Sequence, residues 1–219
     1  MSKQNQRLLI QFAKWPELGQ VKTRMQPHLN VQQSKALHSN LLRFCAGRLY
    51  QPQRWQSQLC LAGRSFDPQR DREKVLSELD IQQALQCATQ GEGDLGARMK
   101  LAAELGLASN KSVVIVGSDC PFIDPSYIED AFEQLESSSE VVVGPAFDGG
   151  YVLIGLASSA VLSVVFDNMP WSQSHLFEKT LAELQNQKVS YSILNRLNDI
   201  DRPEDLILLD DVAEAAAWY

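Results

Sequence analysis

The sequence predicts a single α/β domain in which a mostly parallel sheet is covered by helices on both faces. Short apolar runs typical of strands alternate along the chain with segments whose apolar residues recur at helical spacing. Such alternation is typical of parallel sheets with helices on both sides. The length of 219 residues suits one domain, and no repeat, linker or low-complexity tract divides it. We therefore expect one domain over residues 1–219.

The first half of the chain is predicted to form four strands and two helices. Apolar or β-branched runs define the strands, and apolar residues three or four positions apart define the helices. In chain order these are a strand at 7–13, a helix at 31–50, strands at 55–62 and 81–88, a helix at 95–107 and a strand at 112–116. The last strand is apolar throughout, so we expect it in the centre of the sheet.

The second half continues the alternation. The predicted elements are a helix at 125–136, strands at 141–143 and 151–156, a helix at 172–185, a strand at 189–194 and a helix at 203–210. Asp124 is the expected N-cap of the first of these helices, with proline at the first helical position. Asp201 is a short polar residue that could cap the last helix in the same way.

Composition excludes several function classes. The net charge of −7 argues against a nonspecific nucleic-acid binder, because phosphate backbones are held by basic surfaces. No apolar run approaches the roughly 20 residues of a membrane helix, and the first apolar stretch is too short for a signal peptide. The four cysteines are widely spaced and are expected to be buried, reduced thiols. We expect a soluble cytoplasmic protein without membrane or nucleic-acid partners.

The first candidate site is the segment KWPELGQVKTR, which directly follows the first strand. Ligands of open α/β sheets bind outside the carboxyl ends of the strands. Lys14, Lys22 and Arg24 crowd this loop, and Gly19 shapes its backbone. Three cations in that place indicate a phosphate site, because arginine grips phosphate with two donors and lysine acts as a point charge. The alternative is a solvated basic loop, and the P-loop pattern is absent.

The second candidate is VVIVGSDCP, in which an apolar strand ends and delivers Asp119 to the edge of the sheet. Magnesium and manganese prefer oxygen ligands and commonly use one or two carboxylates together with substrate phosphates. Asp119 is therefore a candidate metal ligand. The alternative is an aspartate that only stabilises a turn.

Two further acidic segments lie later in the chain. In GPAFDGG, Asp148 stands between two predicted strands, where it is either a site residue or part of a hairpin turn. In LNDIDRPED, Asp199 and Asp201 follow the last strand, and one of the two could join Asp119 on a metal. Helix capping is the alternative for Asp201.

The segment QGEGDLGARM opens the helix at 95–107. Gly91 loosens the helix entrance, and Asp94 and Arg98 face whatever binds there, although helix entry alone would explain the pattern. Trp15 and Trp171 either line a cleft or pack in the core. Dispersed histidines and the lack of a GxSxG setting argue against a serine or cysteine nucleophile.

These motifs occur together in the order of a known family. The segments AKWPELGQVKTR, GDLGARM, VGSDCP, GPAFDGGY and DIDRPEDL resemble those of small bacterial glycosyltransferases of A-type fold, described as radical-SAM/selenodomain-associated transferases, some of them assigned to arsenosugar biosynthesis. The similarity runs from about Leu8 to Leu209 and is weakest over residues 51–85. It implies a GT-A-like, Rossmann-like fold of the nucleotide-diphospho-sugar transferase superfamily.

The resemblance also implies roles for the candidate residues. Lys14, Lys22 and Arg24, with the backbone at Gly19, would contact the nucleotide phosphates. The nucleoside side would be bound by Gly91, Asp94 and Arg98. Asp119 would hold Mg²⁺ or Mn²⁺, and Asp148 would face the acceptor or sugar. Because a carboxylate can accept a hydroxyl proton, Asp148 is also our candidate for the general base. The family's Asp-x-Asp is Ser-Asp-Cys here, so Cys120 offers no hard oxygen ligand, and Asp201 is expected to compensate.

Three functions follow, in order of preference. The first is glycosyl transfer from a nucleotide-diphospho-sugar donor to a small-molecule acceptor. The second is nucleotidyl transfer from a nucleoside triphosphate to a phosphorylated small molecule, which the late DIDRPED favours and the lack of a glycine-rich GxGxRM segment disfavours. The third is a module that binds a nucleotide-sugar without turning it over. The sequence leaves the base, sugar, acceptor, stereochemistry and oligomeric state open.

Overall fold

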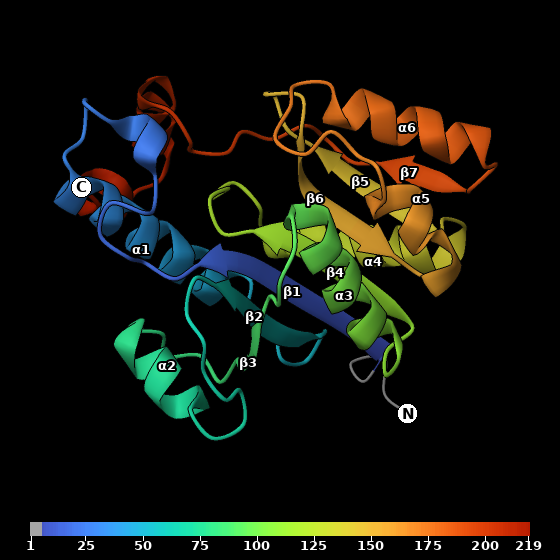
Figure 1. Cartoon of the computed structure of the whole chain (residues 1–219), viewed down its shortest axis with the longest axis horizontal. Helices are drawn as coiled ribbons and strands as arrows, with labels where there is room; N and C mark the ends of the chain where they lie inside the picture. Colours follow the sequence, from blue (N-terminus) through green and yellow to red (C-terminus); the bar gives the residue numbers. More distant parts are fainter. Residues whose placement is uncertain (1–5) are drawn as a thin grey trace.

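The chain forms one seven-stranded sheet in the computed structural model, which describes residues 6–219 (Figure 1). The strand order is β3-β2-β1-β4-β6-β5-β7, and β6 alone runs antiparallel to its neighbours in this described part of the chain. The strands are β1 (Arg7–Lys14), β2 (Gln56–Ala62), β3 (Gln86–Thr89), β4 (Ser112–Gly117), β5 (Val141–Pro145), β6 (Tyr151–Leu156) and β7 (Tyr191–Ile193). The predicted mostly parallel α/β fold is confirmed.

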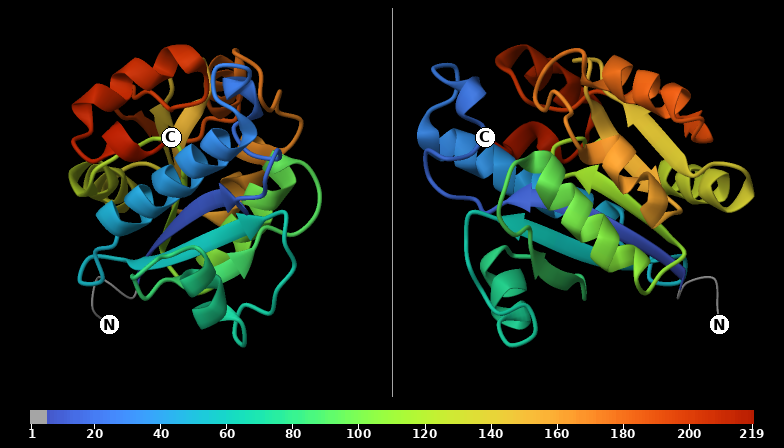
Figure 2. Two further views of the ribbon diagram at one scale, coloured as in Figure 1. Left: turned by 90° about the vertical axis from the view of Figure 1, so that its left-hand side faces the viewer. Right: turned by 45° about the vertical axis from the view of Figure 1, so that its right-hand side comes forward.

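Helices cover both faces of this sheet (Figure 2). The α-helices are α1 (Val31–Arg48), α2 (Arg72–Glu78), α3 (Leu95–Leu107), α4 (Pro125–Ser137), α5 (Leu162–Phe166) and α6 (Leu176–Asn186). Alternation along β1 explains the two layers, because successive side chains of a strand point to opposite faces. Leu8 and Ile10 pack with α3, α5 and α6, whereas Leu9 packs with α4 and Ala13 with α1 and α2. Both faces of the strand are therefore apolar.

The middle of the chain departs from the predicted elements. The strand expected at 81–88 is confined to β3, and the polar stretch before it forms α2. Val75 and Leu76 of α2 pack on β2, so a few apolar residues in contact with the sheet override a polar local composition. The short helix α5 was not predicted for a different reason, because an element of five residues has too few turns to show a period.

Two predicted helices begin differently from expectation. The helix expected at 172–185 starts only at Leu176, because Ser172 adopts a φ of 65° and interrupts the helical backbone. The last helix is a 3-10 helix, η4 (Pro203–Asp211), and its expected cap by Asp201 is wrong. Asp205 instead accepts hydrogen bonds from the backbone N–H groups of Asp201 and Arg202, at 2.9 and 2.7 Å. The carboxylate of Asp201 is thereby left for other partners.

The C-terminal segment lies beside the loop that precedes α1, as the red and blue ribbons of Figures 1 and 2 show. Leu206 and Leu209 of η4 and Trp218 share a buried cluster with Met25 and Leu37. Met25 belongs to η2 (Thr23–Met25), the 3-10 turn that carries Arg24. Two segments almost a chain length apart are thus joined by apolar packing. Over residues 6–219, no helix combines the length and apolar character needed to cross a membrane.

Candidate functional site

The loop after β1 carries the cations predicted to bind phosphate. Lys14 ends the strand with an exposed side chain, and its carbonyl oxygen accepts a hydrogen bond from Nε2 of His38 at 2.9 Å. Burial lowers the pKa of His38, so the ring is neutral and Nε2 carries the proton that a carbonyl oxygen requires. Gly19 then turns the loop at a φ of +75°, a conformation that favours glycine. The helix α1 therefore holds the end of β1 from which the cationic loop departs.

Lys22 is the most constrained of these cations. Its backbone is left-handed, with a φ of 48°, and its side chain is only 4% exposed. The ammonium Nζ donates to the carbonyl oxygen of Ile200 at 2.6 Å and to Oδ2 of Asp119 at 3.1 Å. It also lies 3.9 Å from Oδ1 of Asp201. Three segments far apart in the sequence therefore meet at one buried positive charge.

Asp119 lies just beyond the carboxyl end of β4, and its side chain is 38% exposed. Burial by itself would raise its pKa, but the charge and hydrogen bond of Lys22 outweigh burial and lower it. Asp119 is therefore an ionised carboxylate. Its loop is tied to the late segment by the bond from Ile200 N to Asp119 O, at 2.9 Å, and by the thiol of Cys120, which donates to Asn198 O at 3.1 Å.

Cys120 takes the place of the second acidic residue of the motif, and it serves packing. Its side chain is buried, and burial raises the pKa of the thiol to about 12. A neutral thiol that donates to a backbone carbonyl is a structural contact. The other three cysteines are buried and unpaired as well, which confirms the prediction of reduced thiols.

Arg24 and Asp201 form an ion pair next to Lys22. Arg24 Nη1 lies 2.6 Å from Asp201 Oδ2. Since Asp201 also lies near Lys22, both of its carboxylate oxygens have a cationic neighbour. The structure thus brings together four predicted site residues, namely Lys22, Arg24, Asp119 and Asp201.

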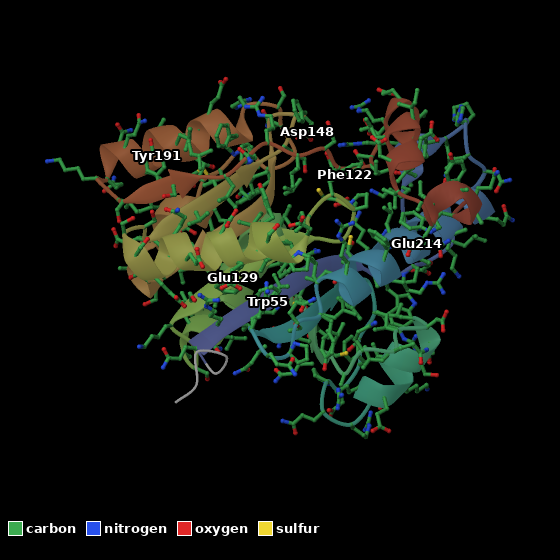
Figure 3. The ribbon with its side chains drawn as sticks, turned by 180° about the vertical axis from the view of Figure 1, so that it is seen from behind. Trp55, Phe122, Glu129, Asp148, Tyr191 and Glu214 are labelled. Carbon is green, nitrogen blue, oxygen red and sulfur yellow. The ribbon has the colours of Figure 1, made fainter. Side chains whose placement is uncertain are left out.

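Asp148 and Asp199 form a second acidic pair at the same edge. Asp148 lies in the turn between β5 and β6 and accepts a hydrogen bond from Gly150 N at 2.8 Å; Figure 3 shows it beyond the strand ends. Burial, followed by the negative charges of Asp119 and Asp148, raises the pKa of Asp199 to about 7. The carboxyl group of Asp199 therefore lies where the neighbouring negative charges outweigh the positive ones. A group of this kind is a candidate for proton transfer or cation binding.

The glycine-rich segment connects the end of β3 to the start of α3. Gly91 has a φ of +75°, and the side chain of Asp94 caps α3 by accepting from Ala97 N at 2.8 Å. The Arg98 Nε is buried and has no hydrogen-bond partner in the part of the chain that the structure describes. No hydrogen bond or ion pair between residues 6–219 links Gly91, Asp94 or Arg98 to the carboxylates described above. Their assignment to the nucleoside stays a prediction.

The sequence profile of DUF2064, described as an uncharacterized protein conserved in bacteria, matches residues 45–173, more than half of the chain. The chain belongs to the DUF2064 family. A comparison with curated proteins found no match.

Solved structures share the fold of this DUF2064 chain over nearly its whole length. A Desulfovibrio desulfuricans G20 protein, assigned as a nucleotide-diphospho-sugar transferase, is 26% identical with a TM-score of 0.84, over 99% of this chain and 90% of that one. An inositol-1-phosphate CTP transferase from T. maritima is 13% identical with a TM-score of 0.57, over 98% and 99%. Rv0371c from Mycobacterium tuberculosis H37Rv, in complex with manganese, is 15% identical with a TM-score of 0.51, over 94% and 98%. The predicted superfamily of nucleotide-diphospho-sugar transferases is confirmed.

The acidic residues of the DUF2064 site offer oxygen ligands but no complete site for a divalent cation. Carboxylate oxygens suit Mg²⁺ or Mn²⁺. Within residues 6–219, however, no three His, Cys, Asp or Glu side chains stand close enough to form a ready metal site. The ammonium of Lys22 already lies between Asp119 and Asp201. Asp199, beside Asp119 and without a cationic partner at contact distance in the described chain, fits a cation better than Asp201 does.

Sequence reasoning missed several residues that shape this DUF2064 site. Gln90 donates from Nε2 to Ala13 O and Cys60 O, both at 3.0 Å, and so ties the ends of β1 and β2 together. The guanidinium carbon of Arg196 lies 5.6 Å from the ring centroid of Phe147 and 5.9 Å from that of Phe177. Neither arrangement has a local signal, because each depends on residues brought together by the fold.

Proposed function

We propose that the chain is a cytoplasmic, single-domain enzyme that transfers a sugar from a nucleotide-diphospho-sugar to a small-molecule acceptor. One observation carries the proposal. Lys22 meets Asp119 and the segment 199–201 outside the carboxyl ends of β1 and β4, the place where open α/β sheets bind ligands. The 26% identical Desulfovibrio desulfuricans structure, assigned as a nucleotide-diphospho-sugar transferase, supports the same class of donor.

In this proposal the cationic loop binds the diphosphate. Lys14 is exposed, and Arg24 is 54% exposed, so both can reach a ligand above the sheet. Negative charge grows on the diphosphate as the bond to the sugar breaks, and cations already fixed in place stabilise that charge without reorganising. Lys22 is such a cation, since two hydrogen bonds hold its ammonium group.

Asp119 and Asp199 would hold Mg²⁺ or Mn²⁺, which when bound would add positive charge beside the diphosphate. The sequence nominated Asp201 as the second ligand, but its two cationic neighbours favour Asp199. Asp148 is exposed and stands on a short turn, where its carboxylate can accept the proton of an acceptor hydroxyl. The Nε of Arg98, which has no hydrogen-bond partner in the described chain, is available as a hydrogen-bond donor to the nucleoside.

The test is the variant Asp119→Asn, which keeps the size of the side chain and removes its charge. Donor and metal are first identified by a thermal-shift panel of nucleotide-sugars, nucleoside diphosphates and triphosphates, with and without Mg²⁺ or Mn²⁺, since a ligand at 100 times its Kd adds about 2.7 kcal/mol of stability. With that donor, Asp119→Asn should lower turnover by about 100-fold while the fold persists.

Asp130→Asn is the matched control, because Asp130 is exposed on α4 and forms no ion pair with any site residue in the described chain. It should turn over the donor at the unaltered rate. Equal turnover by both variants would remove Asp119 from the mechanism. Binding of one nucleotide-sugar without turnover across a broad acceptor panel would instead favour a binding module.

Nucleotidyl transfer is the second candidate, and Arg196 is the observation that favours it. An exposed guanidinium over the ring of Phe147, the residue before Asp148 in the sequence, suits a phosphorylated acceptor, and such an acceptor is what attack on a nucleoside triphosphate would need. Release of pyrophosphate from any triphosphate in the panel would establish this reaction in place of glycosyl transfer.

A further inference from the structure

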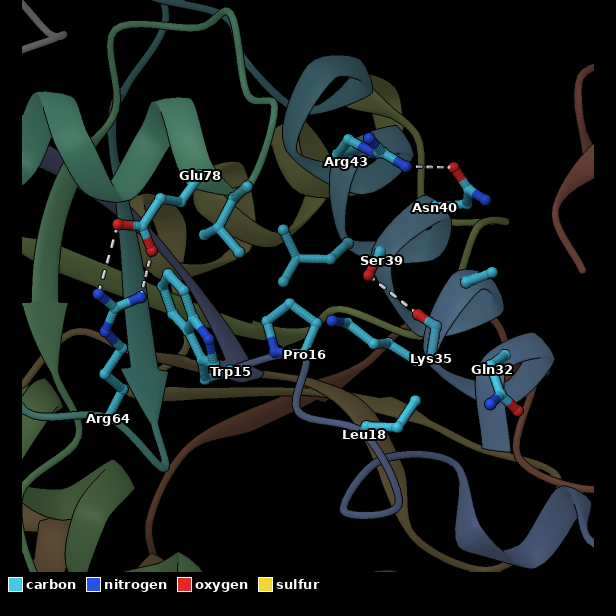
Figure 4. Close-up of a pocket in the computed structure, with 13 residues that line it drawn as sticks. Trp15, Pro16, Leu18, Gln32, Lys35, Ser39, Asn40, Arg43, Arg64 and Glu78 are labelled. Carbon is cyan, nitrogen blue, oxygen red and sulfur yellow. Dashed lines mark hydrogen bonds and ion pairs between the residues drawn. The ribbon is translucent and has the colours of Figure 1, made fainter. Parts of the chain in front are cut away.

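A cavity of about 700 Å³ opens beside the cationic loop, outside the site described above (Figure 4). It lies between the loop Trp15–Leu18, the first half of α1 and the end of α2. No residue assigned to the nucleotide, the metal or catalysis lines it. Its volume is in the range of small-molecule sites, roughly 300–1,000 Å³.

One wall of the cavity is apolar and fixed. Trp15, Pro16 and Leu18 form it together with Leu42 and Leu79. The guanidinium carbon of Arg64 stacks 4.2 Å from the centroid of the Trp15 ring, and Arg64 is itself hydrogen-bonded to Glu78. Figure 4 shows Trp15 between Arg64 and Pro16. The ring is thus braced while Leu18, which is 51% exposed, leaves the rim open to solvent.

The polar wall carries one uncompensated positive charge. Arg64 is paired with Glu78, and Arg43 is paired with Asp80 at 2.8 Å and donates to Asn40 at 2.7 Å. Lys35, one helical turn before Ser39 on α1, has no ion pair with any residue from 6 to 219. Lys35 is therefore the one unpaired cation among the described residues that line the cavity, and it shares the cavity with the apolar wall.

We propose that this cavity binds an amphipathic monoanion, a small molecule with a flat apolar body and one singly charged anionic group. The body would pack against Trp15, Pro16 and Leu18, because planar rings gain contact area on such a wall. The anionic group would bind the ammonium of Lys35, since a hydrogen bond between charged groups is stronger than one between neutral groups. Arg43 and Arg64 are each neutralised by an acidic partner, so Lys35 supplies the only net positive charge among the described lining residues. The cavity should therefore prefer a ligand with a single negative charge. This inference does not depend on the reaction proposed above.

The experiment compares 2-naphthoate with its neutral analogue 2-naphthamide by isothermal titration calorimetry. The full-length protein should bind the carboxylate roughly tenfold more tightly than the amide, the ratio expected for a charge-assisted contact. Lys35→Gln should abolish that ratio and leave the affinity for the amide unchanged. Trp15→Phe, which keeps an aromatic ring but removes area, should weaken both compounds together.

Lys111→Gln is the matched control, because Lys111 is exposed at the opposite end of the sheet, before β4. It should bind both compounds as the unaltered protein does, and thermal unfolding of each variant should confirm that it is folded. The proposal is overturned if neither compound binds, if carboxylate and amide bind equally, or if Lys35→Gln binds like Lys111→Gln.

Discussion

Two groups of charged residues lie at one edge of the sheet, and they differ in whether their side chains form ion pairs. In the paired group, which consists of Lys22, Arg24, Asp119 and Asp201, each side chain contacts an opposite charge. In the unpaired group, which consists of Asp148, Asp199 and Arg196, no member forms an ion pair with any other described residue. Two aspartates there face each other's charge, and an arginine is held by two aromatic rings.

The difference indicates what each group is prepared for. The paired group is neutralised before any ligand arrives, so it can fix the loop after β1 and the C-terminal segment in place. The charges of the unpaired group form no ion pair within the described chain, so a ligand, a proton or a cation can pair with them. We therefore expect changes in the paired group to affect folding as well as turnover, and changes in the unpaired group to affect mainly pH dependence and ligand binding.

Lys22→Met and Gly149→Ala should give the two largest losses of stability, and Lys22→Met tests the paired group. It leaves Asp119 and the Ile200 carbonyl oxygen without their partner, and breaking one member of a buried pair costs about 3 kcal/mol. Urea unfolding measures the change, with Lys111→Met as an exposed control that should stay within about 0.5 kcal/mol. The double variant Lys22→Met/Asp119→Asn should recover part of the loss. A single variant as stable as the control would mean that the paired group does not hold the site together.

Gly149→Ala tests whether the turn that carries Asp148 is held as firmly as the paired group around Lys22. Gly149 has a φ of +92°, and an added Cβ would lie 1.7 Å from Ser174 O, so a loss of about 3 kcal/mol is expected. Gly19→Ala is the control, because its φ is +75° but nothing lies within 4 Å of the added Cβ. Backbone strain alone costs it about 1 kcal/mol. Equal losses in urea unfolding would show that the loop at Ser174 does not support the turn.

Asp199→Asn should alter the pH dependence of stability. The folded pKa of Asp199 is raised to about 7, so between about pH 4 and pH 7 the folded chain keeps a proton that the unfolded chain has released. This contribution to the free energy of unfolding therefore falls as pH rises through that window. After discounting for solvent screening, the wild-type protein should lose about 2 kcal/mol more than Asp199→Asn between pH 4 and pH 8. Urea unfolding in EDTA measures it, and parallel curves would contradict a raised pKa.

Arg196→Gln should have the smallest effect on folding. Exposed cation–π contacts with Phe147 and Phe177 are worth under about 1 kcal/mol, so thermal unfolding should hardly change. If Arg196 binds an anionic acceptor, the KM for that acceptor should rise about tenfold, with kcat little altered. Lysine at this position should restore part of the affinity, because it keeps the charge. A stability loss as large as that of Lys22→Met would place Arg196 in the scaffold.

Much of the fold was predictable from local patterns. The helix at 95–107 and the strand at 151–156 have the predicted bounds, since each shows a regular apolar pattern. The cap at Asp124 is confirmed by its hydrogen bond from Tyr127 N at 2.9 Å. The position of Asp119 just after a buried strand also followed from the sequence, because strand ends are visible as the end of an apolar run. Short elements such as α2 and α5 lacked such a pattern.

The sequence by itself determined the fold class, the family motifs and the placement of candidate residues at strand ends. Tertiary structure alone decided which of them meet. Lys22 contacts residues 97 and 178 positions away, and the raised pKa of Asp199 comes from burial and from Asp119 and Asp148. Burial and charge act over a few ångströms in space, and their effects do not depend on how far apart two residues lie in the sequence. For that reason a local pattern can nominate Asp119, Asp148, Asp199 and Asp201, but only the packed sheet separates the paired aspartates from the unpaired ones.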